Sequence, residues 1–137
     1  MKLPIVLIGS SNTSKASVGK LLAEQLDLPF ISLADISEKY YLEIGFSQTQ
    51  QEQAWEEDGV DGFYRYIQPF NAYVIERALS EYRESIIEFA PEESVYDNNQ
   101  LLEKVEQILQ PLTHVILLLY SPNTEESIQE LEESNTA

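Results

Sequence analysis

Residues 3–31, LPIVLIGSSNTSKASVGKLLAEQLDLPFI, contain the pattern that is most informative about the fold. Leu3–Ile8 is a continuous apolar run that ends in the turn signal Gly9–Asn12, which is typical of a strand buried on both faces. Lys15–Leu26 has apolar residues at helical spacing, and Leu28–Ile31 is a second short apolar run. A strand, a helix and a strand in this order predict a βαβ unit with two parallel strands.

The rest of the chain continues this alternation of helices and strands. Its patterns predict helices over residues 35–44, 49–57, 63–82, 98–109 and 124–133, and strands over residues 85–89 and 114–120. Four strands separated by helices predict an α/β fold, a three-layer sandwich with a parallel sheet in which residues 3–8 are central. Because no internal repeat or low-complexity linker interrupts the pattern, we expect residues 1–137 to form a single domain with a frayed tail over 134–137.

Charge and composition exclude several classes of function. The chain has 8 Lys and Arg against 24 Asp and Glu, a formal net charge of −16, so nucleic acid would be repelled. It has no cysteine and one histidine, His114, which excludes thiolate catalysis, cysteine-based zinc sites and a histidine-rich metal site. Since no apolar run reaches the roughly 18 residues that cross a bilayer, we expect no membrane segment and a cytoplasmic protein.

The turn after the first predicted strand resembles a phosphate-binding loop. Such loops follow the pattern GxxxxGK[ST], in which backbone amides and the lysine hold phosphates and the hydroxyl holds magnesium. In GSSNTSKA, residues 9–16, the first glycine and the lysine are present, but serine replaces the second glycine and alanine replaces the hydroxyl residue. The candidate anion-binding residues are Gly9, Asn12, Thr13, Ser14, Lys15, Ala16 and Ser17. The alternative is an ordinary capped turn with an exposed lysine.

Residues 5–31 as a whole resemble the opening of shikimate kinases, which are P-loop small-molecule kinases. In that family a GxxGxGKSTVG loop leads through a Leu- and Ala-rich helix to LPF, and SVGKLL at residues 17–22 matches this helix. The resemblance continues through YYLEIGF at 40–46, GFYR at 62–65 and VILLLYSP at 115–122, so it covers most of the chain. It implies a P-loop kinase-like fold, with ATP and Mg²⁺ as cofactors.

Several positions that carry the family's chemistry are changed in this chain. The two aspartates that the resemblance places near magnesium and the substrate hydroxyls fall on Ser32 and Ala34, and the substrate-binding arginine falls on Tyr64. Asp35 and Arg65 lie one place away, but in a strand or helix a one-residue shift turns a side chain to another face. We therefore expect neither residue to replace the lost group.

Two further differences point the same way. The family's glycine-rich turn falls on residues 90–92, where Pro91 lacks an amide donor and Glu92 adds negative charge. The chain also ends before the arginine-bearing lid and the adenine-binding strand of the family could occur, which suggests a shortened member. Phosphoryl transfer depends on positioning and on neutralising charge with Lys, Mg²⁺ and Arg. We therefore expect ATP and Mg²⁺ binding to be weak or absent, and we assign no metal ligand and no catalytic residue.

Three functional hypotheses follow. The first is a degenerate shikimate-kinase-like protein that acts as a binding or regulatory module. The second is an active ATP-dependent small-molecule kinase that uses Lys15 and Ser17 with an unusual metal site, and the third is a decayed paralogue without activity. In addition, the strand over residues 114–120 is expected near a sheet edge, and exposed edges invite pairing. We expect a homodimer or a protein partner there, and the acidic residues 125–133 favour a basic partner surface.

Overall fold

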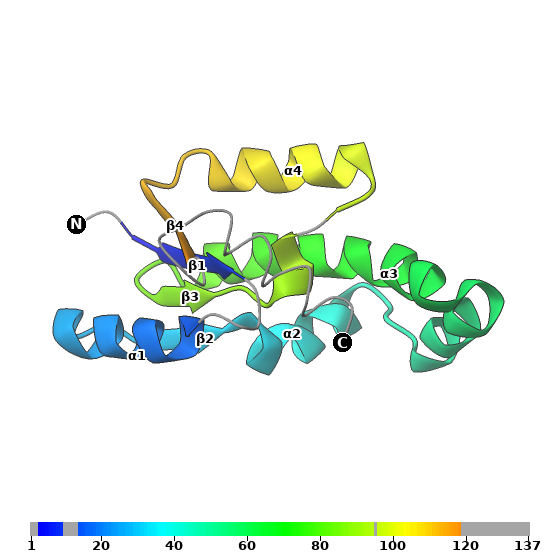
Figure 1. The fold of residues 1–137 in the computed structure, drawn as a ribbon, viewed down its shortest axis with the longest axis horizontal. Helices are drawn as coiled ribbons and strands as arrows, with labels where there is room; N and C mark the ends of the chain where they lie inside the picture. The colour runs from blue at the N-terminus through cyan, green and yellow to red at the C-terminus, as the bar shows by residue number, and fades with distance from the viewer. Residues whose placement is uncertain (1–2, 10–13, 95, 119–137) are drawn as a thin grey trace.

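The protein folds into a parallel sheet with helices packed on both faces (Figure 1). The computed structural model describes residues 3–9, 14–94 and 96–118. In chain order the elements are β1 (Ile5–Gly9), α1 (Lys15–Leu26), β2 (Phe30–Ser32), α2 (Leu33–Glu43), α3 (Gln48–Glu81), β3 (Ile86–Glu88), the 3-10 helix η1 (Pro91–Ser94), α4 (Asn99–Leu109) and β4 (His114–Leu118).

The sheet has four strands in the order β2-β3-β1-β4, and every pairing is parallel. Ile5 of β1 pairs with Ile86 on one side and with His114 on the other, so β1 is an inner strand, as the sequence predicts. Among the described residues β4 forms one edge of the sheet and β2 the other. The predicted α/β class with a parallel four-stranded sheet is confirmed.

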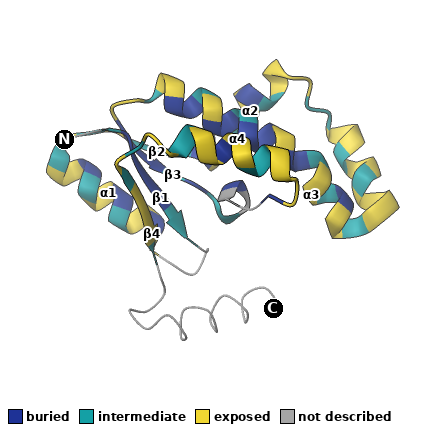
Figure 2. Ribbon diagram, turned by 90° about the horizontal axis from the view of Figure 1, so that it is seen from above, coloured by how far each residue is buried: buried dark blue, intermediate teal, exposed yellow. Residues whose placement is uncertain are grey.

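Alternating side chains of β1 face two different helical layers. Leu7 is completely buried in a cluster with Ala23 of α1, while Val6 is completely buried in a larger cluster with residues of α3 and α4. This alternation is the period-two pattern of a strand that is covered on both faces. Figures 1 and 2 show α1 on the opposite side of the sheet from α4, so the predicted three layers are present.

A glycine in α1 allows this helix to lie directly on the sheet. A Cβ atom added to Gly19 would lie 2.3 Å from the ring of Phe30 in β2. Any larger residue would push α1 away from β2. Gly19 therefore fixes the position of the helix that begins with Lys15.

The long helix α3 contains a break that the sequence predicts. Separate helices are expected over residues 49–57 and 63–82, and the structure has one element with a kink at Gly59, whose φ of +61° suits glycine. We call residues 48–58 the first segment of α3 and residues 60–81 the second segment. The segments approach closely at Gly62, where an added Cβ would lie 2.2 Å from the carbonyl oxygen of Ala54.

The structure differs from the predictions at the start of the second strand. β2 covers Phe30–Ser32 instead of residues 28–31. Pro29 has no amide hydrogen to donate to the neighbouring strand, so it takes part only through its carbonyl oxygen, which accepts a hydrogen bond from the Ile86 amide. As a result Ser32 is a strand residue in register with Glu88. The helix and tail expected over residues 124–137 lie outside the described residues. Within the described part of the chain, no helix has the length and apolar character to cross a membrane.

Candidate functional site

Four of the predicted phosphate-loop residues, Ser14–Ser17, line a pocket at the carboxyl ends of the strands, where ligands gather in parallel α/β folds. The pocket has a volume of about 330 Å³, and Gly9 is not among its described lining residues. These come from the starts of α1 and α2, the ends of β2 and β3, and the turn into η1: Ser14, Lys15, Ala16, Ser17, Ser32, Ala34, Glu88, Ala90 and Pro91. Asn12 and Thr13 of the predicted site lie outside the described residues. The structure therefore brings Ser14–Ser17 together in one pocket wall.

Lys15 is buried in this wall and does not extend into solvent. Its side chain is only 5% exposed, and its ammonium group donates a 2.8 Å hydrogen bond to the carbonyl oxygen of Gly9. Ser14 occupies the N-cap position of α1 but makes no capping hydrogen bond with its side chain. The alternative left open by the sequence expected an exposed lysine, and on this point it is wrong.

Glu88 is a pocket residue that the sequence analysis missed. It is the last residue of β3, and one of its carboxylate oxygens accepts a 2.9 Å hydrogen bond from the Ser32 hydroxyl on the neighbouring strand. The register of β2 and β3 places these two residues side by side. A charged residue at the end of the otherwise apolar strand IIE was the available signal, because carboxyl ends of parallel strands point to the ligand edge.

Asp35 and Arg65 do not line this pocket. Asp35 was expected in a strand or at its end, but it is an exposed residue in the first turn of α2, because this helix begins at Leu33. Arg65 is exposed and its guanidinium forms a 2.8 Å ion pair with Asp58. Both side chains therefore lie outside the described lining that contains Ser32 and Ala34.

These residues lack most of the groups of the magnesium–nucleotide site that the resemblance implies. Ala16 and Ala34 offer no side-chain oxygen, and the described lining has one cation, Lys15, against one carboxylate, Glu88. A carboxylate in a phosphate pocket repels the phosphates, most strongly where water is excluded. Among the described residues, no group of three or more His, Cys, Asp or Glu side chains could hold a metal ion.

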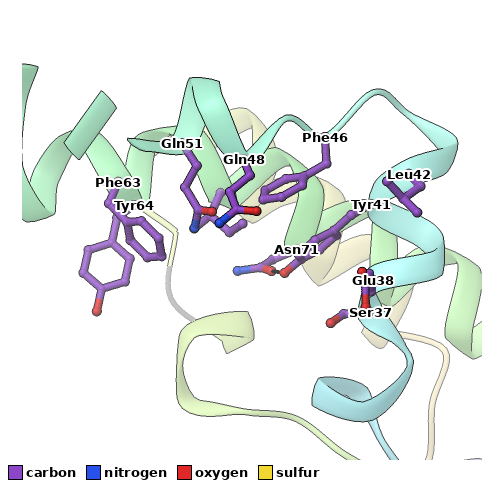
Figure 3. Close-up of a pocket in the computed structure, with 11 residues that line it drawn as sticks. Ser37, Glu38, Tyr41, Leu42, Phe46, Gln48, Gln51, Phe63, Tyr64 and Asn71 are labelled. Carbon is purple, nitrogen blue, oxygen red and sulfur yellow. Dashed lines mark hydrogen bonds between the residues drawn. The ribbon is translucent and has the colours of Figure 1, made fainter. Parts of the chain in front are cut away.

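A second and larger pocket, of about 630 Å³, lies between α2 and the two segments of α3 (Figure 3). We call it the helical pocket. Its described lining residues are mostly aromatic or uncharged polar: Ser37, Glu38, Tyr41, Leu42, Phe46, Gln48, Gln51, Phe63, Tyr64, Ile67 and Asn71. Tyr64, where the resemblance expects the substrate-binding arginine, therefore belongs to this wall.

Aromatic rings form much of the helical pocket. The rings of Tyr41 and Phe46 have centroids 5.1 Å apart, and those of Phe63 and Tyr64 are 5.5 Å apart. The Tyr41 hydroxyl donates a short hydrogen bond to the side-chain oxygen of Asn71. Asn71 is only 1% exposed, and its amide nitrogen has no hydrogen-bond partner among the described residues. A buried donor of this kind normally has a partner.

Polar contacts hold α2 against the second segment of α3 next to this pocket. Glu43 accepts hydrogen bonds from the Tyr73 hydroxyl, at 2.8 Å, and from the Arg77 guanidinium, at 3.1 Å. The bond from Tyr73, reinforced by the bond from Arg77, lowers the pKa of the Glu43 carboxyl. The buried Tyr40 hydroxyl donates to Glu81, and burial together with this bond raises the pKa of Tyr40.

Comparisons with known proteins identify the fold. No protein-family model matches the chain, and no curated protein sequence matches it. The shikimate kinase from Acinetobacter baumannii in complex with shikimate superposes with a TM-score of 0.50 at 18% identity, over 91% of this chain and 59% of that chain. This chain thus spans about three-fifths of that protein and shares its P-loop kinase-like fold.

Two further shikimate kinases are similar to a lesser degree. The protein from Aquifex aeolicus has a TM-score of 0.43 at 17% identity, over 98% of this chain and 96% of its own. The protein from Bacteroides thetaiotaomicron has a TM-score of 0.42 at 17% identity, with both chains fully covered.

Proposed function

We propose that this protein is a binding module built on the shikimate-kinase-like fold, with weak or no nucleotide binding and no phosphoryl transfer. The observation that carries the proposal is the Glu88 carboxylate in the pocket where phosphates would bind. Its hydrogen bond from Ser32 fixes it at the pocket wall. The one described cation of the pocket, Lys15, is bonded to the carbonyl of Gly9.

Charge balance supports this proposal. Phosphate groups are bound where amides and cations exceed carboxylates. Here the charges of Lys15 and Glu88 cancel in the described lining, and the whole chain adds a net charge of −16. Since the described residues supply neither a second cation nor a metal ligand set here, little remains to neutralise a triphosphate.

Isothermal titration with ATP and ADP, each with and without Mg²⁺, tests the proposal. We expect a Kd no tighter than about 1 mM, which corresponds to about 4 kcal/mol of binding free energy. Glu88→Gln keeps the shape of the side chain and removes its charge, so it should tighten nucleotide binding. Micromolar affinity of the unmodified protein for ATP would contradict the proposal.

A second candidate function, ATP-dependent phosphorylation of a small molecule, is favoured by the same residue. Through its contact with Ser32, Glu88 brings a carboxylate to the position where the resemblance implies an aspartate near magnesium. Mg²⁺ in such sites is often held by only one or two carboxylates. The Glu88→Gln variant separates the two candidates, because in a kinase it should weaken Mg²⁺-dependent nucleotide binding and in a binding module it should strengthen it.

We also propose that a partner protein with a basic surface covers the β4 edge. Val115, Ile116 and Leu117 are exposed there, and within the described residues β4 pairs only with β1 (Figure 2). The strand HVILL contains no Lys or Pro, which commonly guard such edges. Charge selects the occupant, since a net charge of −16 repels a second copy and attracts a basic chain.

A further inference from the structure

The described lining of the helical pocket carries a negative charge, whereas a site for acidic ligands would need a positive one. Among its described lining residues, Glu38 is the only one with a formal charge. Tyr64 stands where the resemblance expects an arginine for the substrate. The neighbouring Arg65 points to Asp58, and Arg77 is paired with Glu43 and Glu81. A carboxylate ligand would therefore find no described cation in the pocket wall.

The aromatic walls favour a cation. Positive groups are attracted to the faces of Tyr and Phe rings within about 6 Å of the ring centre. Phe63 and Tyr64 pack edge to face on one side, and Tyr41 and Phe46 contact each other nearby. Figure 3 shows these two aromatic pairs with Gln48 and Gln51 between them.

The side chain of Asn71 is fixed by a neighbour in the pocket wall. Its oxygen accepts a hydrogen bond from the Tyr41 hydroxyl, and its nitrogen is turned away from Tyr41 (Figure 3). This nitrogen has no acceptor among the described residues, and less than 1 Å² of its surface is accessible, so it does not open into the pocket. Asn71 therefore positions the Tyr41 side chain and is not itself a contact for a ligand.

We infer that the helical pocket binds a small organic cation. The Glu38 carboxylate and the aromatic faces attract its ammonium group. This inference rests on the proposed role as a binding module and adds a ligand class to it.

A titration with matched probes tests the inference. Choline carries an ammonium and a hydroxyl group, its neutral carbon isostere dimethylbutanol carries only the hydroxyl, and dimethylbutanoate is the corresponding anion. We expect choline to bind about tenfold more tightly than the neutral isostere, as expected for cation–π attraction together with one carboxylate. The anion should bind most weakly. Binding is followed by NMR, with the Asn71 side-chain amide and the Tyr64 ring signals as reporters of the site.

Two variants of the pocket and one control make the test specific. Glu38→Gln removes the charge, and Tyr64→Leu removes a ring face at an exposed position where folding is not threatened. Each should weaken choline binding about fivefold and leave the neutral isostere almost unchanged. Glu56→Gln makes the same charge change on an exposed residue of α3 that does not line the pocket, and it should have no effect.

Several results would contradict the inference that the helical pocket binds an organic cation. Equal affinity for choline and its isostere, no choline binding, or choline binding that is insensitive to Glu38→Gln would overturn the inference, and so would signal changes confined to residues outside the pocket. The nucleotide titration described above is a separate measurement. Tight ATP binding would remove the proposed function, whereas failure of the choline test with weak ATP binding would remove only the ligand class.

Discussion

The two pockets of this protein lie on the same fold and differ in how their charges are arranged. In the strand-end pocket Lys15 and Glu88 cancel each other, and alanines stand at 16 and 34. In the helical pocket the described lining has one carboxylate, Glu38, and four aromatic rings. The core beneath both is fully formed, with Val6, Leu7 and Ile87 completely buried. The comparison shows that a few lining residues set what a pocket binds, while the fold depends on packing.

The largest expected effect concerns two glycines at close contacts of helices, Gly19 in α1 and Gly62 in α3. Gly62→Ala and Gly19→Ala should each lower the free energy of unfolding by about 2 kcal/mol. The new Cβ would overlap Ala54 in the first variant and Phe30 in the second. The cost of this overpacking exceeds the gain in helix propensity, which is at most about 1 kcal/mol. Chemical denaturation measures both. The variants should also separate the pockets, since Gly62→Ala weakens choline binding and Gly19→Ala leaves it intact.

A control defines the outcome that would contradict this prediction. Ser80 is an exposed residue of α3, and Ser80→Ala should change stability by less than about 0.5 kcal/mol. If the two glycine variants were as stable as this control, the close packing at Gly19 and Gly62 would not determine the positions of the helices.

The next effect in size concerns repair of the strand-end pocket. The triple variant Asn12→Gly, Ser14→Gly and Ala16→Ser restores the loop pattern and should raise nucleotide affinity about tenfold, or about 1.4 kcal/mol. No turnover should follow, because Ser32 and Ala34 still lack carboxylates. Titration with ATP and a coupled ADP-release assay measure both quantities. Measurable phosphoryl transfer would mean that the catalytic groups lie elsewhere.

The fold was predictable from the sequence to a greater extent than the site. The runs at Leu3–Ile8 and Lys15–Leu26 carry their own periodicity, so strand, helix and parallel order follow from local pattern. Glu88 and Ser32 are 56 residues apart and meet only through the register of β2 and β3. The helical pocket likewise depends on the kink at Gly59, which brings α2 and both segments of α3 together. Contacts between residues so far apart in the sequence cannot be predicted from the local spacing of residues.

A smaller effect concerns the polar contacts beside the helical pocket. The folded-state pKa of Glu43 lies below its ordinary value of 4.5, because Tyr73 and then Arg77 donate hydrogen bonds to the carboxylate. Its contribution to stability is therefore fully present above about pH 4.5 and is lost as the pH falls through the lowered pKa. Glu43→Gln should reduce stability at neutral pH, and the difference from the unmodified protein should shrink in acid.

Thermal unfolding at a series of pH values tests this prediction, with Glu56→Gln as the matched control. A difference between Glu43→Gln and the unmodified protein that stays constant down to pH 3 would show that the carboxylate charge has no part in joining α2 to α3.

The smallest expected effect is at the β4 edge, where binding depends on weak strand pairing and on charges that salt screens. A synthetic peptide of alternating valine and lysine should slow amide hydrogen exchange over residues 115–118, and a valine–glutamate peptide should not. Leu117 is 62% exposed, so Leu117→Lys should abolish the protection without unfolding the protein, because a lysine guards the edge and repels the basic peptide. Leu21→Lys, at a similarly exposed leucine of α1, serves as the matched control.

Light scattering over a concentration series identifies the competing occupant of the β4 edge. Protection that grows with protein concentration and accompanies dimer formation would assign the edge to a second copy of the chain. Free exchange in the presence of either peptide, with a strict monomer, would mean that β4 remains an open edge and that the proposal of a basic partner is wrong.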